Sequence, residues 1–535
     1  MARQAVVTWR DKRWWLVVPP LVGMAVTVLV TDKGLYVSPD SVSYVGTARR
    51  LLDGQGWSPP PGLPRLGHFP PLFTLVLAGV GRLGLDPLEA ARVVNMVAFG
   101  ALIALVGAVL WRRTGSVGAG VVGSVLVLSA VDLLTFSAAA LSEPLFIVLA
   151  VAAIVALAEY LDHRRPGLLG LAVALAAAAV LTRYVGVALV LAGAAVLVGL
   201  GAKRRWHGAG DAAVFTVMAT APVLAWATWA ARAREGKVED RTIAVHLPDL
   251  DYLGQSVRPL ARWVVPFVGP GLGLGLAALV VLVGLAVLRR PSPGSETSSA
   301  SALPWLLGTF AVAYLAVLVA DRALLDVSGR LDSRFLAPLH VVAVLLVVPP
   351  VHGALRRRAG QADSRRFARV PAAAMAGVAG LVALQVADAA VWTADGVGDV
   401  GIARRGYTAE AWRRSDVVAA VAATEAGRPV YTNGFDAVFL LTGRHTLPLP
   451  VEKNYLTGED NPRYAEELAA VQRSGGLVAY FDALTARQSF LASQAELERA
   501  LSLQPMASDD VGTLYRLEPQ PPRSSSATPN ARSSD

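Results

Sequence analysis

Four charged residues stand beside long apolar runs of this chain, where charged side chains are rare. Asp40 follows the first run, and Glu143 opens a later one. Arg183 interrupts a long apolar stretch, and Arg334 opens another. Arginine forms bidentate pairs with phosphate oxygens and stays charged in apolar surroundings, and a carboxylate can take a proton from a hydroxyl group. These residue types therefore suit a reaction on a lipid-linked phosphate, in which a cation stabilises the departing phosphate beside the bilayer.

Each of these residues also has a purely structural interpretation. Asp40 could be the N-cap of a helix over residues 40–52, because Asp is common at that position. Glu143 and Pro144 would suit the first turn of a helix capped by Ser142, where a negative charge also favours the helix dipole. The two arginines could instead extend to the phosphates of lipid headgroups. Position in the sequence alone leaves both interpretations open.

Three further polar residues fit the same pattern less strongly. His68 precedes an aromatic residue and two prolines, which suit a chain that re-enters the membrane surface, but a lone His is more typical of a structural role. Arg258 and Arg262 lie in a large loop expected on the same side as Arg183. They are weaker versions of the same arginine pattern.

The composition indicates a membrane protein. The chain is 54% hydrophobic and 17% charged, whereas a soluble domain usually carries about 25% charged residues. Long apolar runs alternate with short Arg-rich connections up to about residue 392. The net charge of +9 comes mostly from those connections, which is the positive-inside pattern rather than a nucleic-acid-binding surface. The chain has no Cys, which excludes disulfides, thiol catalysis and cysteine zinc sites.

The apolar runs predict a mainly α, polytopic transmembrane helical bundle of about eleven spans. The basic N-terminus and the lack of a cleavage site favour an uncleaved first span that starts in the cytoplasm. Residues 71–83 are short for a crossing and are expected to be re-entrant or interfacial. The expected spans are residues 14–30, 88–110, 117–131, 141–161, a hairpin of two over 168–198 with Arg183 at its tip, 212–231, 264–288, 304–320, 335–351 and 370–392.

Three regions are expected along the chain. Residues 1–392 form the membrane domain, with outer loops at 31–70, 232–262 and 321–334. Residues 393–518 form a small extracytoplasmic α/β domain, and residues 519–535 are a Pro/Ser-rich disordered tail. The elements expected in the second region are a helix over 416–425 capped by Ser415, strands near 429–431, 477–481 and 512–517, and an amphipathic helix over 484–501.

Several short motifs, each weak alone, share one order and one expected side of the membrane. They are Asp40 with Tyr44, Pro70 to Phe73, Ser142 to Phe146, Thr182 to Tyr184, Arg334 to Pro338, and a closing soluble domain. This arrangement resembles the GT-C superfamily of membrane glycosyltransferases. It is similar in particular to the bacterial group related to protein O-mannosyltransferases and the lipid A aminoarabinose transferase. The segments Tyr431–Gly434 and Leu441–Arg444 resemble the tail domain of actinobacterial members, and the predominance of Ala, Val and Arg hints at a GC-rich genome.

The resemblance implies an inverting transfer of a hexosyl or pentosyl group from a polyprenyl-phosphate donor in the cytoplasmic membrane. The acceptor would be an envelope glycan, lipid or protein outside the cytoplasm. Asp40 would be the general base. Many relatives carry a second acidic residue beside this Asp, where the present chain has Ser41. No obligatory metal or other cofactor is therefore expected, although a divalent metal would be compatible. The residues expected to contact the lipid phosphate or sugar are Tyr44, His68, Glu143, Arg183, Tyr184 and Arg334.

Two other functions fit part of the pattern. A transporter or flippase for a lipid-linked substrate would also use charges at membrane level, but it should show internal repeats and polar residues at the midplane. No clear repeat is present, and the charges gather on the expected outer side. A non-catalytic scaffold could bind envelope components through the C-terminal domain, and it would not need Asp40. The expected partners are the lipid donor, an envelope acceptor and membrane lipid, with no nucleic acid.

Overall fold

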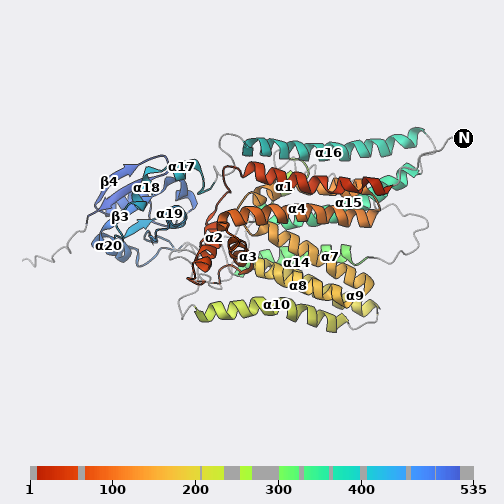
Figure 1. Cartoon of the computed structure of the whole chain (residues 1–535), viewed down its shortest axis with the longest axis horizontal. Coiled ribbons are helices and arrows are strands. Elements are labelled where there is room, and N and C mark those ends of the chain that lie inside the picture. Colours follow the sequence, from red (N-terminus) through yellow and green to blue (C-terminus); the bar gives the residue numbers. More distant parts are fainter. Residues whose placement is uncertain are drawn as a thin grey trace, which may run out of the picture. The chain divides into compact units, whose positions relative to one another are not determined.

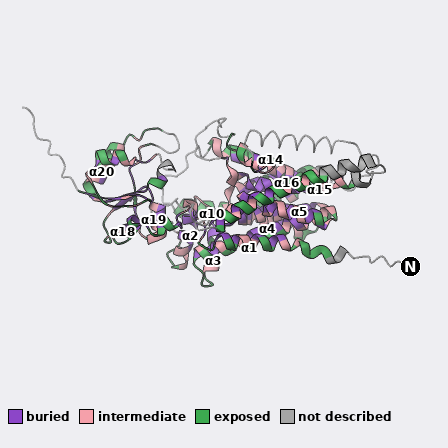
Figure 2. Cartoon of the chain, turned by 90° about the horizontal axis from the view of Figure 1, so that it is seen from above, coloured by how far each residue is buried: buried purple, intermediate pink, exposed green. Residues whose placement is uncertain are grey.

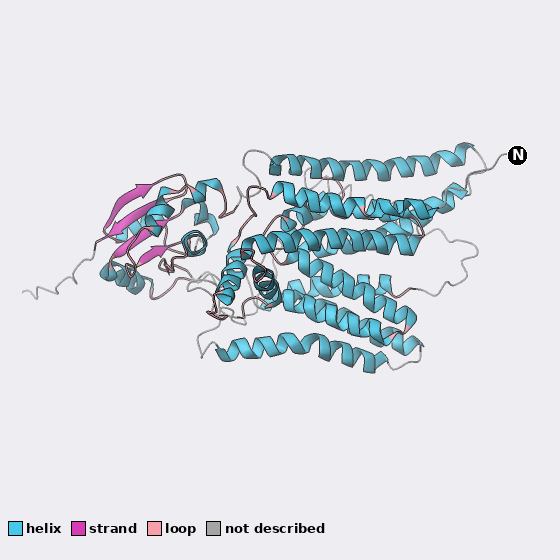
Figure 3. Ribbon diagram, viewed as in Figure 1, coloured by secondary structure: helices cyan, strands magenta, loops and turns pink. Residues whose placement is uncertain are grey.

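The computed structural model describes residues 9–57, 67–204, 208–233, 254–267, 301–324, 331–360, 365–397, 406–453, 459–487 and 490–518. The chain divides into two compact units, of which one ends at Gly406 and the other continues from Tyr407. The first unit is a bundle of long helices (Figure 1). The strands of the sheet all belong to the second unit (Figure 3).

The helical unit alternates long apolar helices with short connections. Its elements are η1 (Trp9–Leu16), α1 (Val18–Val30), α2 (Pro39–Leu52), α3 (Leu72–Gly81), α4 (Pro87–Thr114), α5 (Val117–Leu128), α6 (Val131–Ser137), α7 (Glu143–His163), α8 (Pro166–Thr182), η2 (Tyr184–Gly186), α9 (Val187–Arg204), α10 (Gly208–Ala233), α12 (Val257–Arg262), α14 (Leu303–Leu324), α15 (Ser333–Gly360) and α16 (Arg365–Val397).

The described residues contain eight helices that are long and apolar enough to cross a membrane. The count becomes nine if α5 and α6, which are bent by 64° where they meet, form one broken span. The multi-pass prediction is therefore confirmed. The span expected over 117–131 corresponds to α5, which meets α6 at this bend. Most of the span expected over 264–288 lies outside the described residues, so the total of about eleven stays a prediction.

The helices differ in how deeply they lie in the bundle. About two thirds of the most apolar window of α7 is buried (67%), whereas the corresponding value for α10 and for α16 is 17%. Figure 2 shows the buried residues gathered inside the bundle and the exposed ones on its outer faces. The outward-facing residues of α10 include Val217, Met218 and Leu224, which suits contact with lipid. The central position of α7 makes it a rigid support for the residues at its two ends.

Close packing of α4 on α5 depends on small residues. A Cβ atom added to Gly120 would lie 2.7 Å from the carbonyl oxygen of Gly107 on the neighbouring helix. Such close backbone approach is a common mode of helix association in membranes, because lipid offers no hydrophobic driving force between helices. In this pair, Ser124 of α5 also donates a hydrogen bond to the carbonyl of Ile103 (3.1 Å).

Helices α2 and α3 lie across one end of the bundle instead of along its long axis (Figure 1). They share a core in which Tyr44, Val45 and Ala48 of α2 pack with Phe73 and Leu77 of α3. Helix α3 has 10 residues, which span about 15 Å, roughly half of a bilayer's hydrocarbon core. This agrees with the expected interfacial or re-entrant segment.

The second unit is a small α/β domain, as predicted. Its sheet has the strand order β2-β1-β3-β5-β4, with β2, β1 and β3 parallel and β5 and β4 antiparallel to their neighbours. Ser415 caps α18 by accepting from the amide of Val418. The elements are α17 (Glu410–Arg413), α18 (Asp416–Ala422), β1 (Val430–Thr432), α19 (Phe435–Thr442), β2 (Leu447–Pro448), α20 (Tyr464–Ser474), β3 (Gly476–Tyr480), η4 (Asp482–Arg487), α21 (Gln494–Ala500), β4 (Leu503–Ser508) and β5 (Thr513–Leu517).

Two expectations for this part of the chain need correction. The continuous helix over 484–501 is wrong, because Leu491 forms a bridge with Val451 and a new helix starts after Ser493. Ser493 and Glu496 form a capping box there, which satisfies the free backbone donors of the new helix start. The boundary expected at residue 392 falls inside α16, which continues to Val397. The tail expected from residue 519 lies outside the described residues.

Candidate active site

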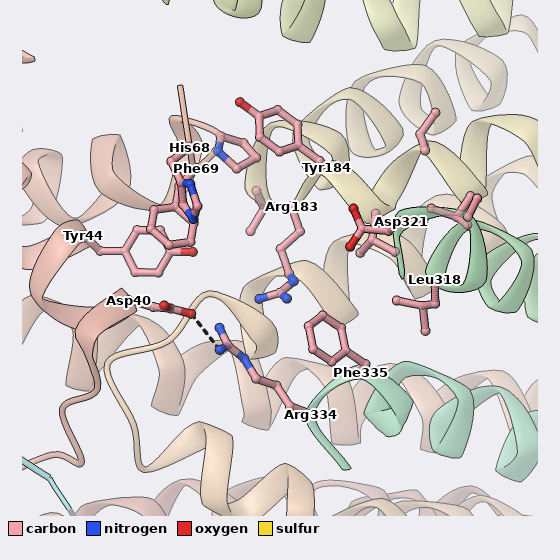
Figure 4. Close-up of a pocket in the computed structure, with 16 residues that line it drawn as sticks. Asp40, Tyr44, His68, Phe69, Arg183, Tyr184, Leu318, Asp321, Arg334 and Phe335 are labelled. Carbon is pink, nitrogen blue, oxygen red and sulfur yellow. Dashed lines mark ion pairs between the residues drawn. The ribbon is translucent and has the colours of Figure 1, made fainter. Parts of the chain in front are cut away.

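A cavity of about 460 Å³ opens at the end of the bundle that carries α2. Its polar side chains come from five parts of the chain that are distant in sequence: α2, the segment before α3, the turn between α8 and α9, α14 and α15 (Figure 4). The lining residues are Asp40, Tyr44, His68, Phe69, Pro70, Thr182, Arg183, Tyr184, Val185, Val187, Val317, Leu318, Ala320, Asp321, Arg334 and Phe335.

Arg334 and Arg183 form a charge cluster with two carboxylates beside this cavity. Nη1 of Arg334 lies 2.7 Å from Oδ2 of Asp40, and Nε of Arg334 pairs with Oε1 of Glu143. Nη1 of Arg183 lies 2.6 Å from the same oxygen of Glu143. The four charged residues singled out in the sequence therefore meet at one place, although they lie on four different helices or turns.

Asp40 reaches the cluster from the first turn of α2. Ser38, not Asp40, is the N-cap of this helix, and Ser38 and Ser41 form its capping box. The structural alternative for Asp40 is therefore wrong, since its side chain pairs with Arg334 instead of with the helix start. Asp40 keeps 29% of its side chain exposed and lines the cavity.

Glu143 is the first residue of α7 and lies behind the arginines. Its side chain is 2% exposed and does not line the cavity. The expected side-chain cap from Ser142 is also wrong, because the Ser142 hydroxyl lies 3.3 Å from the Tyr44 hydroxyl and 3.4 Å from Nη1 of Arg183. Glu143 thus contacts the two arginines and has no direct access to a ligand in the cavity.

An extended segment before α7 holds Glu143 in place. Residue Ala139 forms a bridge with Tyr36, and the side-chain amide of Asn95 donates to the carbonyls of Ala139 (2.6 Å) and Leu141 (2.9 Å). Asn95 lies on α4 and is fully buried. Sequence reasoning missed Asn95, although a polar amide inside an apolar run was a usable signal.

Arg183 lies at the turn that joins α8 to α9, as the hairpin prediction required. Its guanidinium points into the protein, with 14% of the side chain exposed, so headgroup contact does not explain it. The next residue, Tyr184, donates a hydrogen bond from its hydroxyl to the carbonyl of Gly67 (2.7 Å). This bond ties the hairpin tip to the segment that carries His68 into the cavity wall.

Not all of the other residues expected at the site line the cavity. Tyr44 lines the cavity and packs between Phe69 and Phe73, with ring centroids 4.8 and 5.1 Å away. Arg262 does not belong to the site, because it forms a bidentate pair with Asp388 of α16 at 2.8 and 2.9 Å. The loops expected at 232–262 and 321–334 are only partly within the described residues.

Asp321 near the end of α14 is a cavity residue that the sequence did not single out. In Figure 4 its carboxylate lies on the other side of the Arg183 guanidinium from Asp40. Asp321 directly follows an apolar run, so the sequence offered for it the same signal that it offered for Asp40. The cavity therefore presents carboxylates on two sides of a cationic centre.

The two arginines are the groups of the cavity that can bind an anion. Burial raises the pKa of Asp40, but the charge and hydrogen bond of Arg334, with Arg183 and His68, outweigh it and lower the pKa below its usual value. Each guanidinium group has five N–H donors. Among the described residues, Arg183 donates through Nη1 and Arg334 through Nε and Nη1. The described residues provide no hydrogen-bond acceptor for the other donors of these two groups.

Tyr44 is a neutral donor in the cavity lining. Burial raises the pKa of Tyr44, so its hydroxyl stays protonated and can donate a hydrogen bond. Within the described part of the chain, no group of three or more His, Cys, Asp or Glu side chains is arranged to hold a metal ion. This set of side chains is chemically suited to proton transfer at a carboxylate and to anion binding at guanidinium groups.

Comparison with known proteins gives a fold and no close relative. No protein-family model matches the sequence, and no curated protein sequence matches it either. The crystal structure of ArnT from Cupriavidus metallidurans bound to undecaprenyl phosphate aligns with a TM-score of 0.59 and 14% identity, over 94% of this chain and 98% of that one. Its apo structure aligns with a TM-score of 0.58 and 12% identity, over 94% and 97%. The fold predicted from the motifs is thereby confirmed: the chain shares the fold of ArnT, as the resemblance to the GT-C superfamily implied.

Proposed function

We propose that this protein transfers a sugar from a polyprenyl-phosphate donor to an acceptor hydroxyl group, with Asp40 as the general base. The observation that carries the proposal is the cluster in which Arg183 and Arg334 face a cavity that also exposes Asp40. Arginine pairs suit a phosphate, and a neighbouring carboxylate suits proton removal from a hydroxyl. The undecaprenyl phosphate bound to ArnT, which shares the fold, supports the class of donor.

The proposed reaction is a single displacement. The acceptor oxygen forms a bond with the anomeric carbon while its proton moves to a carboxylate oxygen of Asp40. The bond between the anomeric carbon and the phosphate oxygen breaks, and its electron pair leaves on the polyprenyl phosphate. Arg183 and Arg334 stabilise that developing charge, and attack opposite the leaving group inverts the anomeric configuration.

The two ends of α7 suggest which side of the membrane the cavity faces. Glu143 starts α7 at the site, while Glu159 and Asp162 near its other end pair with Arg112 and Arg113. Basic connections collect on the cytoplasmic side of membrane proteins. The cavity and the acceptor would therefore be extracytoplasmic in the cytoplasmic membrane, with the N-terminus inside and the C-terminal unit outside. The acceptor would be a glycan, lipid or protein of the envelope.

Substitution of Asp40 tests the proposal. The chemical composition of the cell envelope is compared between cells that lack the protein and cells that express the wild type, Asp40→Asn or Arg334→Ala. We expect Asp40→Asn to reach the membrane normally and to lose transfer by about a factor of 10² or more, as removal of a general base does. We expect Arg334→Ala to weaken use of the donor.

Asp53→Asn is the matched control, because Asp53 is an exposed residue at the other end of α2. It should transfer as the wild type does. Normal transfer by Asp40→Asn would remove Asp40 as the base, and a scaffold or a flippase would then explain the protein better. Unchanged donor dependence in Arg334→Ala would remove that residue from the phosphate site.

A further inference from the structure

Arg334 has two carboxylate partners, and they differ in their access to the cavity. Its Nε pairs with Glu143 and its Nη1 pairs with Asp40 at 2.7 Å. The Glu143 side chain is 2% exposed and lies outside the lining, whereas the Asp40 side chain is 29% exposed and lines the cavity. An anion that enters the cavity can therefore compete with Asp40 for Arg334 but cannot reach Glu143.

Glu143 is a fixed support for both arginines. One of its oxygens accepts from Arg183 and from Arg334, and the other, Oε2, is buried without a hydrogen-bond partner among the described residues. A buried carboxylate is expensive to leave without its cations, so these pairs should persist when a ligand binds. The pair between Arg334 and Asp40 is the more exposed of the two, so a ligand in the cavity can reach it.

The charge balance favours competition between a ligand anion and Asp40 for the exposed side of Arg334. The two arginines and the carboxylates of Asp40 and Glu143 have formal charges that cancel, and Asp321 adds a further negative charge to the cavity lining. A phosphate adds negative charge next to Asp40, and both anions then compete for the same guanidinium. Arg334 can turn its outer donors to the phosphate without losing Glu143, because Nε and the Nη atoms point in different directions.

We propose that the donor phosphate displaces Asp40 from Arg334, so that the catalytic base is free only when the donor is bound, while Glu143 holds both arginines in place. The inference rests on the proposed function and adds an order of events to it. Before the donor binds, the pairing with Arg334 keeps Asp40 a poor base. After displacement, the Asp40 carboxylate can accept the proton of the acceptor hydroxyl. The site therefore does not activate a nucleophile, water included, before a donor is present.

The test is the affinity of a polyprenyl phosphate without a sugar for the full-length protein in detergent. The proteins compared are the wild type, Asp40→Asn, Asp40→Ala and Asp321→Asn. We expect both Asp40 variants to bind the lipid phosphate about tenfold more tightly than the wild type, because a charge-assisted competitor is removed. Asp321→Asn removes the same charge from the same cavity without touching the pair with Arg334, so its gain should be smaller.

A double-mutant cycle separates direct competition from a general effect of charge. In an Arg334→Gln background, Asp40→Asn should improve binding no more than Asp321→Asn does. Equal affinity of the wild type and both Asp40 variants would overturn the inference and leave the proposed donor class standing. An equal gain from Asp40→Asn and Asp321→Asn would also overturn it. Failure of the wild type to bind the lipid phosphate at all would overturn the donor class itself.

Discussion

At the scale of single residues, the site depends on arginine having several donors on one planar group. Arg334 bonds Glu143 through Nε and Asp40 through Nη1, so one side chain connects the buried and the exposed carboxylate. A lysine would present one point charge at that place and could not keep both contacts in a fixed geometry. Arg183 likewise pairs with Glu143, which also pairs with Arg334, and it still lines the cavity. The arrangement of the cluster therefore depends on hydrogen bonds that the two arginines and Glu143 share.

Asp321 is expected to recognise sugar hydroxyl groups. A carboxylate accepts hydrogen bonds from hydroxyls, and Asp321 lies across the arginines from the proposed base. We predict that Asp321→Asn raises the KM of one substrate by about tenfold and changes kcat by less than about threefold, because it weakens binding without removing the base. The measurement is steady-state transfer with donor and acceptor varied separately. Unchanged KM values for both substrates would exclude this role.

Residue types predicted the four-residue charge cluster better than they predicted which residues line the cavity. Asp40, Glu143, Arg183 and Arg334 stood out because a charge inside or beside an apolar run is costly. Asp321 also stands at the end of an apolar run, but it was not singled out, because the sequence does not show which of these charged ends face one cavity. Glu143 was expected to contact the lipid phosphate or sugar, but it is buried behind the arginines. The sequence shows where a residue lies along a helix, but it does not show which side chains cover it.

At the scale of elements, Asn95 links the middle of one helix to the start of another. Its side-chain amide holds the carbonyls of Ala139 and Leu141, just before Glu143. We predict that Asn95→Leu lowers stability by about 1–3 kcal/mol, because two buried carbonyls lose their donor. It should also lower transfer per folded molecule, because Glu143 then no longer holds the arginines in place. The measurements are the thermal midpoint in detergent and the activity of the monodisperse fraction.

Ser124→Ala is the matched control for this prediction. Ser124 is also buried in a membrane helix and donates one side-chain bond to a backbone carbonyl, that of Ile103, but it lies on α5 away from the cavity. Loss of the Ser124 hydrogen bond should lower the free energy of unfolding modestly and leave transfer per folded molecule at the wild-type level. If Asn95→Leu behaved in the same way, Asn95 would be a stabilising residue without a role in positioning.

Helices were predictable where a single sequence pattern determined their position. The apolar runs located the long helices, and the break at Arg183 located the hairpin. The bend between α5 and α6 was not predicted, because no Pro or Gly marks residues 129 and 130 and tertiary packing decides the angle. The helix expected over 484–501 failed because its periodicity continued across Ser493, where the capping box begins a separate helix. At this position the capping box, and not the hydrophobic periodicity, determines where the helix begins.

At the scale of the whole molecule, the function depends on which face of the membrane the cavity opens to. The lack of Cys in the natural sequence allows a direct test, because any thiol introduced is the only one present. Gln55 follows α2 at the end of the bundle that carries the cavity, Arg165 lies in the connection between α7 and α8 at the other end, and Ala470 lies on α20 of the C-terminal unit; all three are exposed.

We predict that a membrane-impermeant maleimide labels Gln55→Cys and Ala470→Cys in intact cells, and labels Arg165→Cys only after the membrane is permeabilised. The reason is the basic connection at Arg164 and Arg165, which the positive-inside rule places in the cytoplasm. Since Glu143 and His163 are the two ends of one central helix, Gln55 and Arg165 must then face opposite sides. Labelling of Arg165→Cys in intact cells would invert the bundle and put the cavity in the cytoplasm, where a nucleotide-linked donor would fit better than a lipid-linked one. Labelling of Gln55→Cys but not Ala470→Cys would keep the cavity outside and place an odd number of additional crossings before the C-terminal unit.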